Sequence, residues 1–211
     1  MKKIIAIAAA LLLGFGANAQ VISTLGYTFE WSPQRGDDSY RVAEMNGIYA
    51  GALYNYVLLD FGLGVAGGTY VSYSSGTDRV PGYGKAVFPE VGTREGHRHI
   101  AITIPAYVTY TRDLGPGTLF AYAGVAFQGG FRFQAFDKYD NGKKYYYENQ
   151  FNLSYSNHDR PLDLKVSFGA GYRWKFLQAD MGMDFGTIDR NPDPYYSYRI
   201  HSFHIGISYV Y

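Results

Sequence analysis

The sequence lacks cysteine and is poor in charge, and both shortages limit what the protein can be. With no cysteine among 211 residues, a disulfide framework, a thiolate metal site and a cysteine-linked lipid are all excluded. Charged residues make up only 18% of the chain, and 19 basic against 18 acidic side chains give a net charge of +1. Nucleic-acid-binding domains normally carry a strong basic excess, so we expect no nucleic-acid partner.

Long apolar runs are missing too, except at the start of the chain. Lys2 and Lys3 precede an apolar segment over residues 4–15, and Ala17-Asn18-Ala19 supplies the small-x-small pattern that signal peptidase recognises. We predict a cleaved signal peptide over residues 1–19. An uncleaved anchor is the alternative, although the run is shorter than the ~20 residues that a spanning helix needs. No later stretch approaches that length, so a mature chain that enters a membrane must form a closed barrel.

What the sequence does have is alternation of apolar and polar residues. Within residues 164–176, one side of the pattern is apolar or aromatic and the other carries lysine, serine, glycine and arginine. Successive side chains of a strand point to opposite faces, so this period of two predicts a strand with one apolar side. A helix would mix the two sets around its circumference. The same pattern recurs near both ends of the mature chain.

Eight segments alternate in this way, and the 26 glycines and 22 tyrosines fit β-structure with close backbone contacts. The predicted strands, with boundaries good to about ±2–4 residues, cover residues 22–32, 46–57, 61–74, 98–111, 118–136, 162–176, 179–189 and 199–211. Which face of the second strand points outward stays open. Pro105 removes a ladder donor, so we expect a bulge or an unpaired position there.

Short and long connections alternate along the chain. Residues 58–60, 113–117 and 177–178 are short, whereas the polar segments near 33–45, 75–97, 137–161 and 190–198 are longer. Short turns at one end and long loops at the other are typical of outer-membrane barrels. The sequence therefore predicts an all-β fold: an eight-stranded antiparallel up-and-down transmembrane β-barrel over residues 20–211, after the signal peptide. An even strand number places both termini on the short-turn, periplasmic side.

Alternation alone does not decide which face is outside. Glycines such as Gly26, Gly169 and Gly206 gather on the polar face, and the crowded interior of a small barrel favours residues with little side chain. Aromatic residues near strand ends, such as Trp31 and Trp174, suit the two headgroup interfaces. Both observations favour a lipid-facing apolar side and a polar interior. A soluble lipocalin-like barrel that holds an apolar ligand is the alternative.

The last strand ends on an aromatic residue and is apolar at every second position. These positions are Phe203, Ile205, Ile207, Tyr209 and Tyr211. The pattern looks like the C-terminal signal by which outer-membrane barrels are recognised for insertion, which implies the barrel-assembly machinery as a partner. The mature chain resembles the small eight-stranded outer-membrane proteins of the OmpA/OmpX architecture. Its Gly/Tyr-rich strands, with the segment Ile102-Thr103-Ile104-Pro105-Ala106-Tyr107, are similar to the outer-membrane β-barrel domain proteins common in Bacteroidetes.

On this assignment the polar face carries charges into the barrel. The predicted interior network consists of Glu30, Arg132, Lys165, Arg173, Lys175, Asp180 and Asp184. Buried charges are costly unless they are paired, so we expect salt bridges. If residues 177–178 form the turn, Lys175 faces Asp180 and Arg173 lies diagonally between Asp180 and Asp184. Eight strands leave room only for side chains, which predicts a plugged lumen and no large pore; a proton- or ion-conducting path is the alternative.

We assign no catalytic, cofactor or metal site. His97 and His99 share a strand face and could hold a metal, but a catalytic zinc site needs three protein ligands. His201 and Ser202 are adjacent, so they point to opposite faces and are poorly arranged as base and nucleophile.

The long loops are the remaining candidates for function. Tyr139, Tyr145, Tyr146 and Tyr147 offer amphipathic contact area within residues 137–161, although they could also simply cover one another in a projecting hairpin. We expect a non-enzymatic protein of the bacterial outer membrane, surrounded by lipid, with a structural or surface-interaction role and a partner outside the cell or in the envelope. The alternatives are an accessory component of a secretion or uptake assembly, and a rim enzyme acting on lipid.

Overall fold

The computed structural model describes residues 19–32, 34–35, 44–78, 93–139, 142–147, 160–190 and 197–211. Within these ranges, no helix is long and apolar enough to cross a membrane. The eight long strands are β1 (Ala19–Trp31), β3 (Met45–Val57), β4 (Leu63–Asp78), β5 (Thr93–Leu114), β6 (Gly117–Tyr139), β8 (Leu162–Trp174), β9 (Leu177–Gly186) and β11 (His201–Val210). Short strand β2 (Gln34–Arg35) pairs with β10 (Ser197–Tyr198), and β7 (Lys144–Tyr146) pairs with β6.

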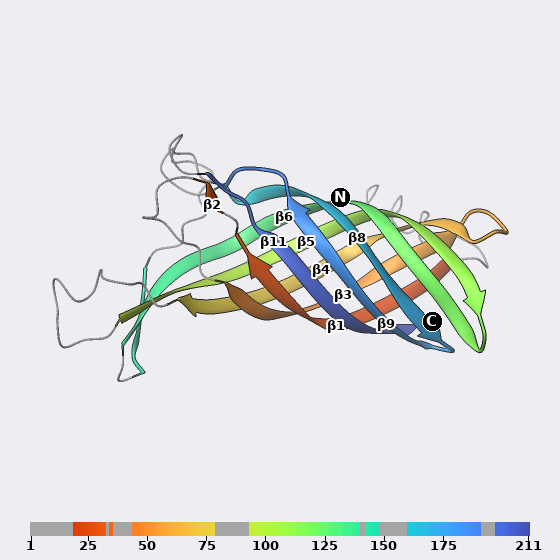
Figure 1. Cartoon of the computed structure of the whole chain (residues 1–211), viewed down its shortest axis with the longest axis horizontal. Coiled ribbons are helices and arrows are strands. Elements are labelled where there is room, and N and C mark those ends of the chain that lie inside the picture. The colour runs from red at the N-terminus through yellow and green to blue at the C-terminus, as the bar shows by residue number, and fades with distance from the viewer. Residues whose placement is uncertain are drawn as a thin grey trace, which may run out of the picture.

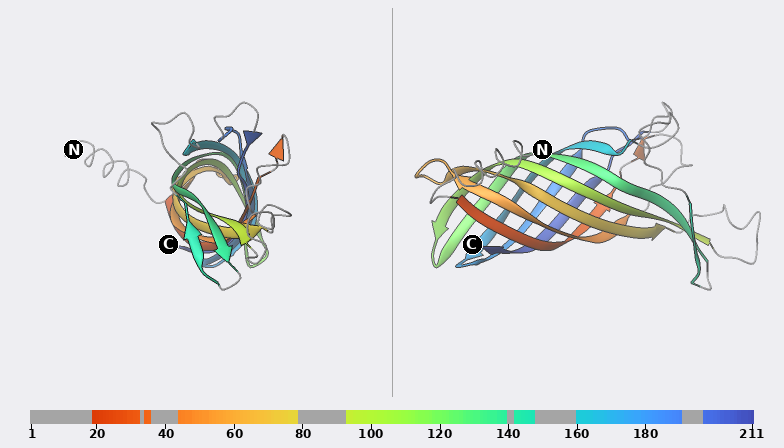
Figure 2. Two further views of the ribbon diagram at one scale, coloured as in Figure 1. Left: turned by 90° about the vertical axis from the view of Figure 1, so that its left-hand side faces the viewer. Right: turned by 180° about the vertical axis from the view of Figure 1, so that it is seen from behind.

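The long strands form one closed antiparallel barrel (Figure 1). Each pairs with the next along the chain, and β1 pairs with β11 to close the ring that Figure 2 shows end-on. Successive cross-strand partners lead once around the ring from Glu30 back to Gln20 on the same strand, which is a shear of ten residues. Closure requires the strands to tilt by roughly 35–45° from the barrel axis and leaves no unpaired edge.

All eight predicted strands are present, and the two ends of the barrel differ as expected. We call the end that carries the short connections 58–62, 115–116 and 175–176 the turn end. Ala19 pairs with Tyr56 there, beside the first short turn, and the chain finishes at the same end (Figure 1). The longer connections lie at the opposite end, the loop end. There β5 and β6, together with β7, extend beyond the other strands (Figure 2).

The apolar side of the alternation faces outward and the polar side faces inward. Leu25, Val108 and Ile207 are 54–66% exposed on the outer surface. Glu30 and Lys165 are each 1% exposed in the interior. The barrel is therefore built for lipid outside and polar contacts inside. A soluble barrel holding an apolar ligand would need the opposite arrangement, so the structure contradicts the lipocalin-like alternative.

The second strand, whose facing the sequence left open, follows the same rule. On β3, Ile48 is 61% exposed, whereas Tyr49 is 8% exposed and points into the lumen. Pro105 also behaves as predicted. It pairs in regular register with Ala126 on β6, but pairing with β4 is interrupted opposite it. The predicted unpaired position is confirmed, and the bulge lies elsewhere.

That bulge corrects one interior prediction. On β5, Ala101 pairs with Gly130 and Ile100 pairs with Arg132, so Phe131 is the extra residue of a bulge in β6. One extra residue reverses the facing of everything beyond it. Arg132 is exposed on the outer surface, and the prediction that it lies inside is wrong. Phe133 takes the interior position instead and is fully buried.

The turn between β8 and β9 corrects a second prediction about the interior charges. Trp174 pairs with Leu177, so Lys175 and Phe176 form the turn, two residues earlier than predicted. Lys175 adopts a left-handed conformation with φ of 55° and is exposed. The prediction that it lies inside opposite Asp180 is therefore wrong. Phe176 packs against Tyr209 with ring centroids 5.2 Å apart, so the apolar alternation continues into the turn although the strand has ended.

The facing of the exterior generates a testable prediction. In refolded protein in lipid vesicles, Leu25→Arg should lower the free energy of unfolding by about 2–4 kcal/mol, because it places a charge on the lipid-facing side of β1. Leu59→Arg, in an exposed turn outside the strands, is the matched control and should change it by less than about 1 kcal/mol. Urea titration measures both. Equal losses in the two variants would contradict the lipid-facing assignment.

Candidate functional site: a polar lumen and an outer hairpin

Charged and polar side chains are concentrated inside the barrel towards the loop end. We call this group the outer polar cluster; it comprises Glu30, His99, Asp163, Lys165, Asp184, Arg190 and Ser202. Six strand residues enter it because inward positions of β1, β5, β8, β9 and β11 meet there. Arg190 differs, since it comes from the connection between β9 and β11. Ionised groups this deeply buried require partners.

Two close contacts between basic and acidic side chains hold the cluster together. His99 Nδ1 lies 2.8 Å from Glu30 Oε2, and both side chains are almost completely buried. The Arg190 guanidinium lies 3.6 Å from Asp163 Oδ2 and donates a hydrogen bond of 2.7 Å to the Gln128 side-chain carbonyl. The other oxygen of Asp163 accepts a bond of 3.1 Å from the backbone N–H of Ile188. The connection after β9 is thus fixed to the barrel wall by a buried carboxylate.

A chain of polar contacts runs from the cluster towards the middle of the lumen. Lys165 Nζ donates to Ser202 Oγ at 3.3 Å, and Ser202 Oγ donates to Asp184 Oδ2 at 2.9 Å. The same Asp184 oxygen lies 3.5 Å from His204 Nδ1, and His204 Nε2 is 2.8 Å from the Tyr122 hydroxyl. Each charged member has a polar partner in this chain, which lowers the cost of its burial.

Apolar side chains are packed beside the cluster at the loop end of the lumen. Met45, Phe133 and Ile200 form a small apolar core with exposures of 0–1%. Arg190 is also fully buried. We call this group the seal; it combines three apolar side chains from two strands and a connection with one guanidinium that is bonded to the wall.

Tyrosines project into the lumen and rest on glycines two strands further along the wall. A Cβ on Gly206 would collide with the Tyr49 hydroxyl, and a Cβ on Gly182 would collide with that of Tyr122. The Tyr49 ring also makes an edge contact with His204 at 5.7 Å between centroids. The glycines on the polar face thus have a specific use, because they leave the space that these rings fill.

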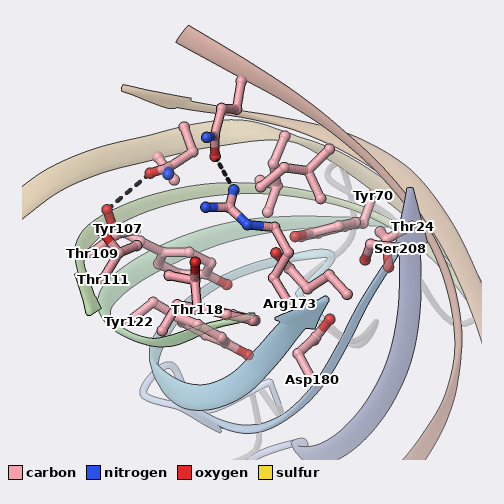
Figure 3. Close-up of a pocket in the computed structure, with 17 residues that line it drawn as sticks. Thr24, Tyr70, Tyr107, Thr109, Thr111, Thr118, Tyr122, Arg173, Asp180 and Ser208 are labelled. Atoms are coloured by element: carbon pink, nitrogen blue, oxygen red, sulfur yellow. Dashed lines mark hydrogen bonds between the residues drawn. The ribbon is translucent and has the colours of Figure 1, made fainter. Parts of the chain in front are cut away.

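Two cavities of about 50 Å³ each remain, one on either side of this aromatic layer. Each has room for a few water molecules. Asp180 lines both cavities. Figure 3 shows the cavity nearer the turn end, with Tyr107 and Tyr122 in its wall and Arg173 extending into it. Arg173 donates a hydrogen bond to the side chain of Gln20 across this space.

The structure thus brings most of the predicted interior charges together. Glu30, Lys165 and Asp184 lie in the outer polar cluster, while Arg173 and Asp180 line the turn-side cavity. The predicted pairing of Arg173 with the two aspartates is not found: Arg173 bonds to Gln20 instead. Arg190 was missed, because it lies in a connection without alternation and no local pattern marks it as buried.

The histidine candidates lie inside the barrel or at its rim. His97 stacks on Phe133 with centroids 5.3 Å apart, and His99 pairs with Glu30. His201 Nδ1 accepts a bond of 3.1 Å from the backbone N–H of Gly186. Across the described ranges, no group of three histidine, aspartate or glutamate side chains is placed to hold a metal ion.

The tyrosine-rich loop forms a hairpin of β6 and β7 beyond the barrel rim. Tyr145, Tyr146 and Tyr147 are 41–59% exposed, and Tyr145 and Tyr147 contact each other edge-on. The Tyr147 hydroxyl donates to Asp137 at 2.5 Å. The tyrosines therefore do contact one another, yet they retain large exposed surfaces. Tyr139 is half-buried at the end of β6, and residues 148–159 lie outside the described ranges.

No protein-family model and no curated protein sequence matches the chain. Among solved structures, the chain is similar to Ail, the attachment invasion locus protein of Yersinia pestis, in complex with the heparin analogue sucrose octasulfate (12% identity, 92% of this chain and 100% of that chain covered, TM-score 0.46). It is also similar to the outer membrane protein OprG from Pseudomonas aeruginosa (9% identity, 92% and 96% covered, TM-score 0.48). Neisserial surface protein A is a third (14% identity, 92% and 97% covered, TM-score 0.40).

The Arg190–Asp163 pair generates a testable prediction. Arg190→Leu should lower the free energy of unfolding by about 3–5 kcal/mol, because it leaves a buried carboxylate without its cation. Asp163→Leu combined with Arg190→Leu should cost clearly less than the sum of the two single changes, as expected for direct partners. Arg199→Leu, an exposed arginine near the same rim, is the control. Additive losses, measured by urea titration, would contradict a direct partnership.

Proposed function

We propose that this chain is a non-enzymatic protein of the bacterial outer membrane, with a closed lumen and a surface-interaction role at its loop end. The apolar exterior supports insertion into a lipid bilayer, since Leu25 and Ile207 are more than 60% exposed. Export by the predicted signal peptide over residues 1–19 and insertion through the pattern that ends on Tyr211 belong to the same proposal. Both termini would then be periplasmic, and the loop end would face outward from the cell.

The observation that carries the proposal is the seal formed by Arg190. A conducting barrel keeps an open polar path, whereas here a buried guanidinium, bonded to Asp163 and Gln128, occupies space inside the loop end of the lumen. The aromatic layer of Tyr49 and Tyr122 supports the same conclusion, because it separates the two small cavities. Transport of solutes through the lumen is therefore not the proposed role.

The placement of Ser202 argues against catalysis in the lumen. Its hydroxyl contacts both Lys165 and Asp184, which resembles an activated nucleophile. Ser202 is however only 4% exposed and lies beneath the seal at the loop end. The contacts are better explained as partners that allow the charges to be buried.

The surface role is assigned to the β6–β7 hairpin, because its tyrosines remain exposed. Tyrosine provides large, rigid contact area and a hydroxyl at low conformational cost, which suits recognition of a partner. Tyr145, at 59%, is the most exposed of the three. An accessory role in an envelope assembly is the second candidate, and it would use the same hairpin or the short turns as a docking surface.

The closed lumen can be tested by conductance. In planar bilayers the unmodified barrel should show no discrete conductance steps. The triple change of Tyr49→Ala, Tyr122→Ala and Arg190→Ala should produce them, because it removes the guanidinium of the seal and two rings of the aromatic layer from an interior that side chains otherwise fill. Asp180 and Asp184 remain in that lumen, so the steps should be cation-selective. Tyr73→Ala, which changes a lipid-facing tyrosine, should stay silent; steps of equal size in the unmodified barrel would overturn the proposal.

The orientation and the surface role can be tested with single cysteines, since the chain has none of its own. In intact cells, Tyr145→Cys should react with a membrane-impermeant maleimide, and Leu59→Cys, in a short turn, should react only after lysis. A photocrosslinking residue at position 145 should then give a discrete cross-linked product that is absent when it is placed at position 59. Labelling of Leu59→Cys in intact cells would reverse the orientation, and a crosslink only from position 59 would favour docking through the turns.

A further inference from the structure

Among the side chains that the structure describes, those on the outward face of the β5–β6–β7 extension include basic groups and no acidic one. Arg98, Arg132, Lys138 and Lys144, which we call the basic face, lie on the side of the sheet that continues the lipid-facing surface of the barrel. Among the described residues, none of the four forms an ion pair with a carboxylate. Asp137, the nearest acidic residue in the strand, points to the other face, where it accepts a bond from Tyr147.

The strand register brings these cations close together. Lys138 pairs directly with Lys144 across β6 and β7, and like charges placed directly opposite each other are destabilising. Arg98 pairs with Gln134, and Ile100 pairs with Arg132, so the two arginines are diagonal neighbours on one face. Diagonal positions lie within reach of long side chains. The bulge at Phe131 creates this arrangement, because without it Arg132 would point into the lumen.

Two of the cations are held in position by aromatic rings. The Arg98 guanidinium lies 4.2 Å from the centroid of the Tyr146 ring, and it also donates to the Gln134 side-chain carbonyl at 2.7 Å. Lys144 Nζ lies 4.5 Å from the centroid of the Phe136 ring. Such contacts reduce the freedom of a long side chain but leave its charge without a counterion.

The height of the basic face indicates what neutralises it. Tyr73 pairs with Ile100, which pairs with Arg132, so Arg132 stands in the same cross-strand row as an outward tyrosine that is 47% exposed. Phe131, next to it, is 61% exposed. An exposed aromatic row above apolar rows is the level at which a barrel meets the headgroups. The basic face begins in that row and continues away from the apolar surface.

We propose that the basic face binds the phosphate groups of anionic lipid headgroups in the leaflet at the loop end. A guanidinium matches a phosphate with two parallel hydrogen bonds, and neighbouring ammonium groups add charge. The face continues the lipid-contacting surface, which makes a lipid a better match than a soluble anion. Only the assignment of that leaflet as the outer one rests on the proposed function. The site itself would hold an anionic lipid in either orientation.

The test is lipid retention by refolded protein in a neutral detergent, followed by native mass spectrometry. Short-chain phosphatidylglycerol should bind at lower concentration than phosphatidylcholine of the same chain length. Arg98→Gln combined with Arg132→Gln should raise the half-saturating concentration by about 25-fold, at roughly five-fold for each arginine near a surface. Arg112→Gln, an exposed arginine at the opposite end of β5, is the matched control and should change it less than two-fold.

Further variants and conditions distinguish specific lipid binding from the alternatives. If the double arginine variant does not refold, Lys138→Gln with Lys144→Gln removes charge beyond the barrel rim and should weaken phosphatidylglycerol binding by a similar factor. Added salt should weaken binding to the unmodified barrel but have less effect on these variants. Equal retention of the two lipids, an equal loss in Arg112→Gln, or full competition by inorganic phosphate would each overturn the proposal. None of these outcomes depends on labelling at position 145, which tests the orientation separately.

Discussion

Ring closure is the constraint on which the rest of this structure depends. In lipid, every backbone N–H and C=O must be paired within the protein, so a sheet has to join its first strand to its last. Here β1 pairs with β11 over ten residue pairs, from Ile22 with Val210 to Trp31 with His201. Once eight strands close with a shear of ten, the interior is narrow, and side chains must fill it. The glycine wall, the inward-pointing tyrosines and the buried contacts between basic and acidic side chains are all consequences of that narrow interior.

Much of this could be predicted because alternation is a local signal. A period of two identified the strands. Glu30, Lys165 and Asp184 could be assigned to the interior because they alternate with apolar residues along their strands. The same reasoning was wrong where the alternation of inward and outward side chains is interrupted. Arg132 lies beyond a bulge, and one extra residue at Phe131 moves it from the lumen to the outer surface. The prediction for Lys175 was wrong because the alternation of apolar residues continues into the β8–β9 turn, after the strand has ended.

The interior contacts were beyond the reach of the sequence for a different reason. Which charges meet depends on shear and tilt, and these come from the register of eight strands together rather than from any one of them. Glu30 thus pairs with His99, which lies 69 residues further along the chain. Arg190 is a stronger example, because it is buried although it lies in a connection that follows no periodic pattern. A salt-bridge network was predictable in kind, whereas its members were not.

The origin of Arg190 also bears on the order of assembly. It lies between the last two strands, and its partners Asp163 and Gln128 stand on β8 and β6. The guanidinium reaches them along one part of the wall, because β9, β8 and β6 are consecutive strands of the barrel. The bond from Arg173 on β8 to Gln20 on β1 differs, since it joins residues 153 apart in the chain. Contacts between such distant segments form late in folding, because the entropy of closing the intervening chain opposes them. The Arg173–Gln20 bond is thus a marker of completion, since β1 comes near β8 only when it has paired with β11.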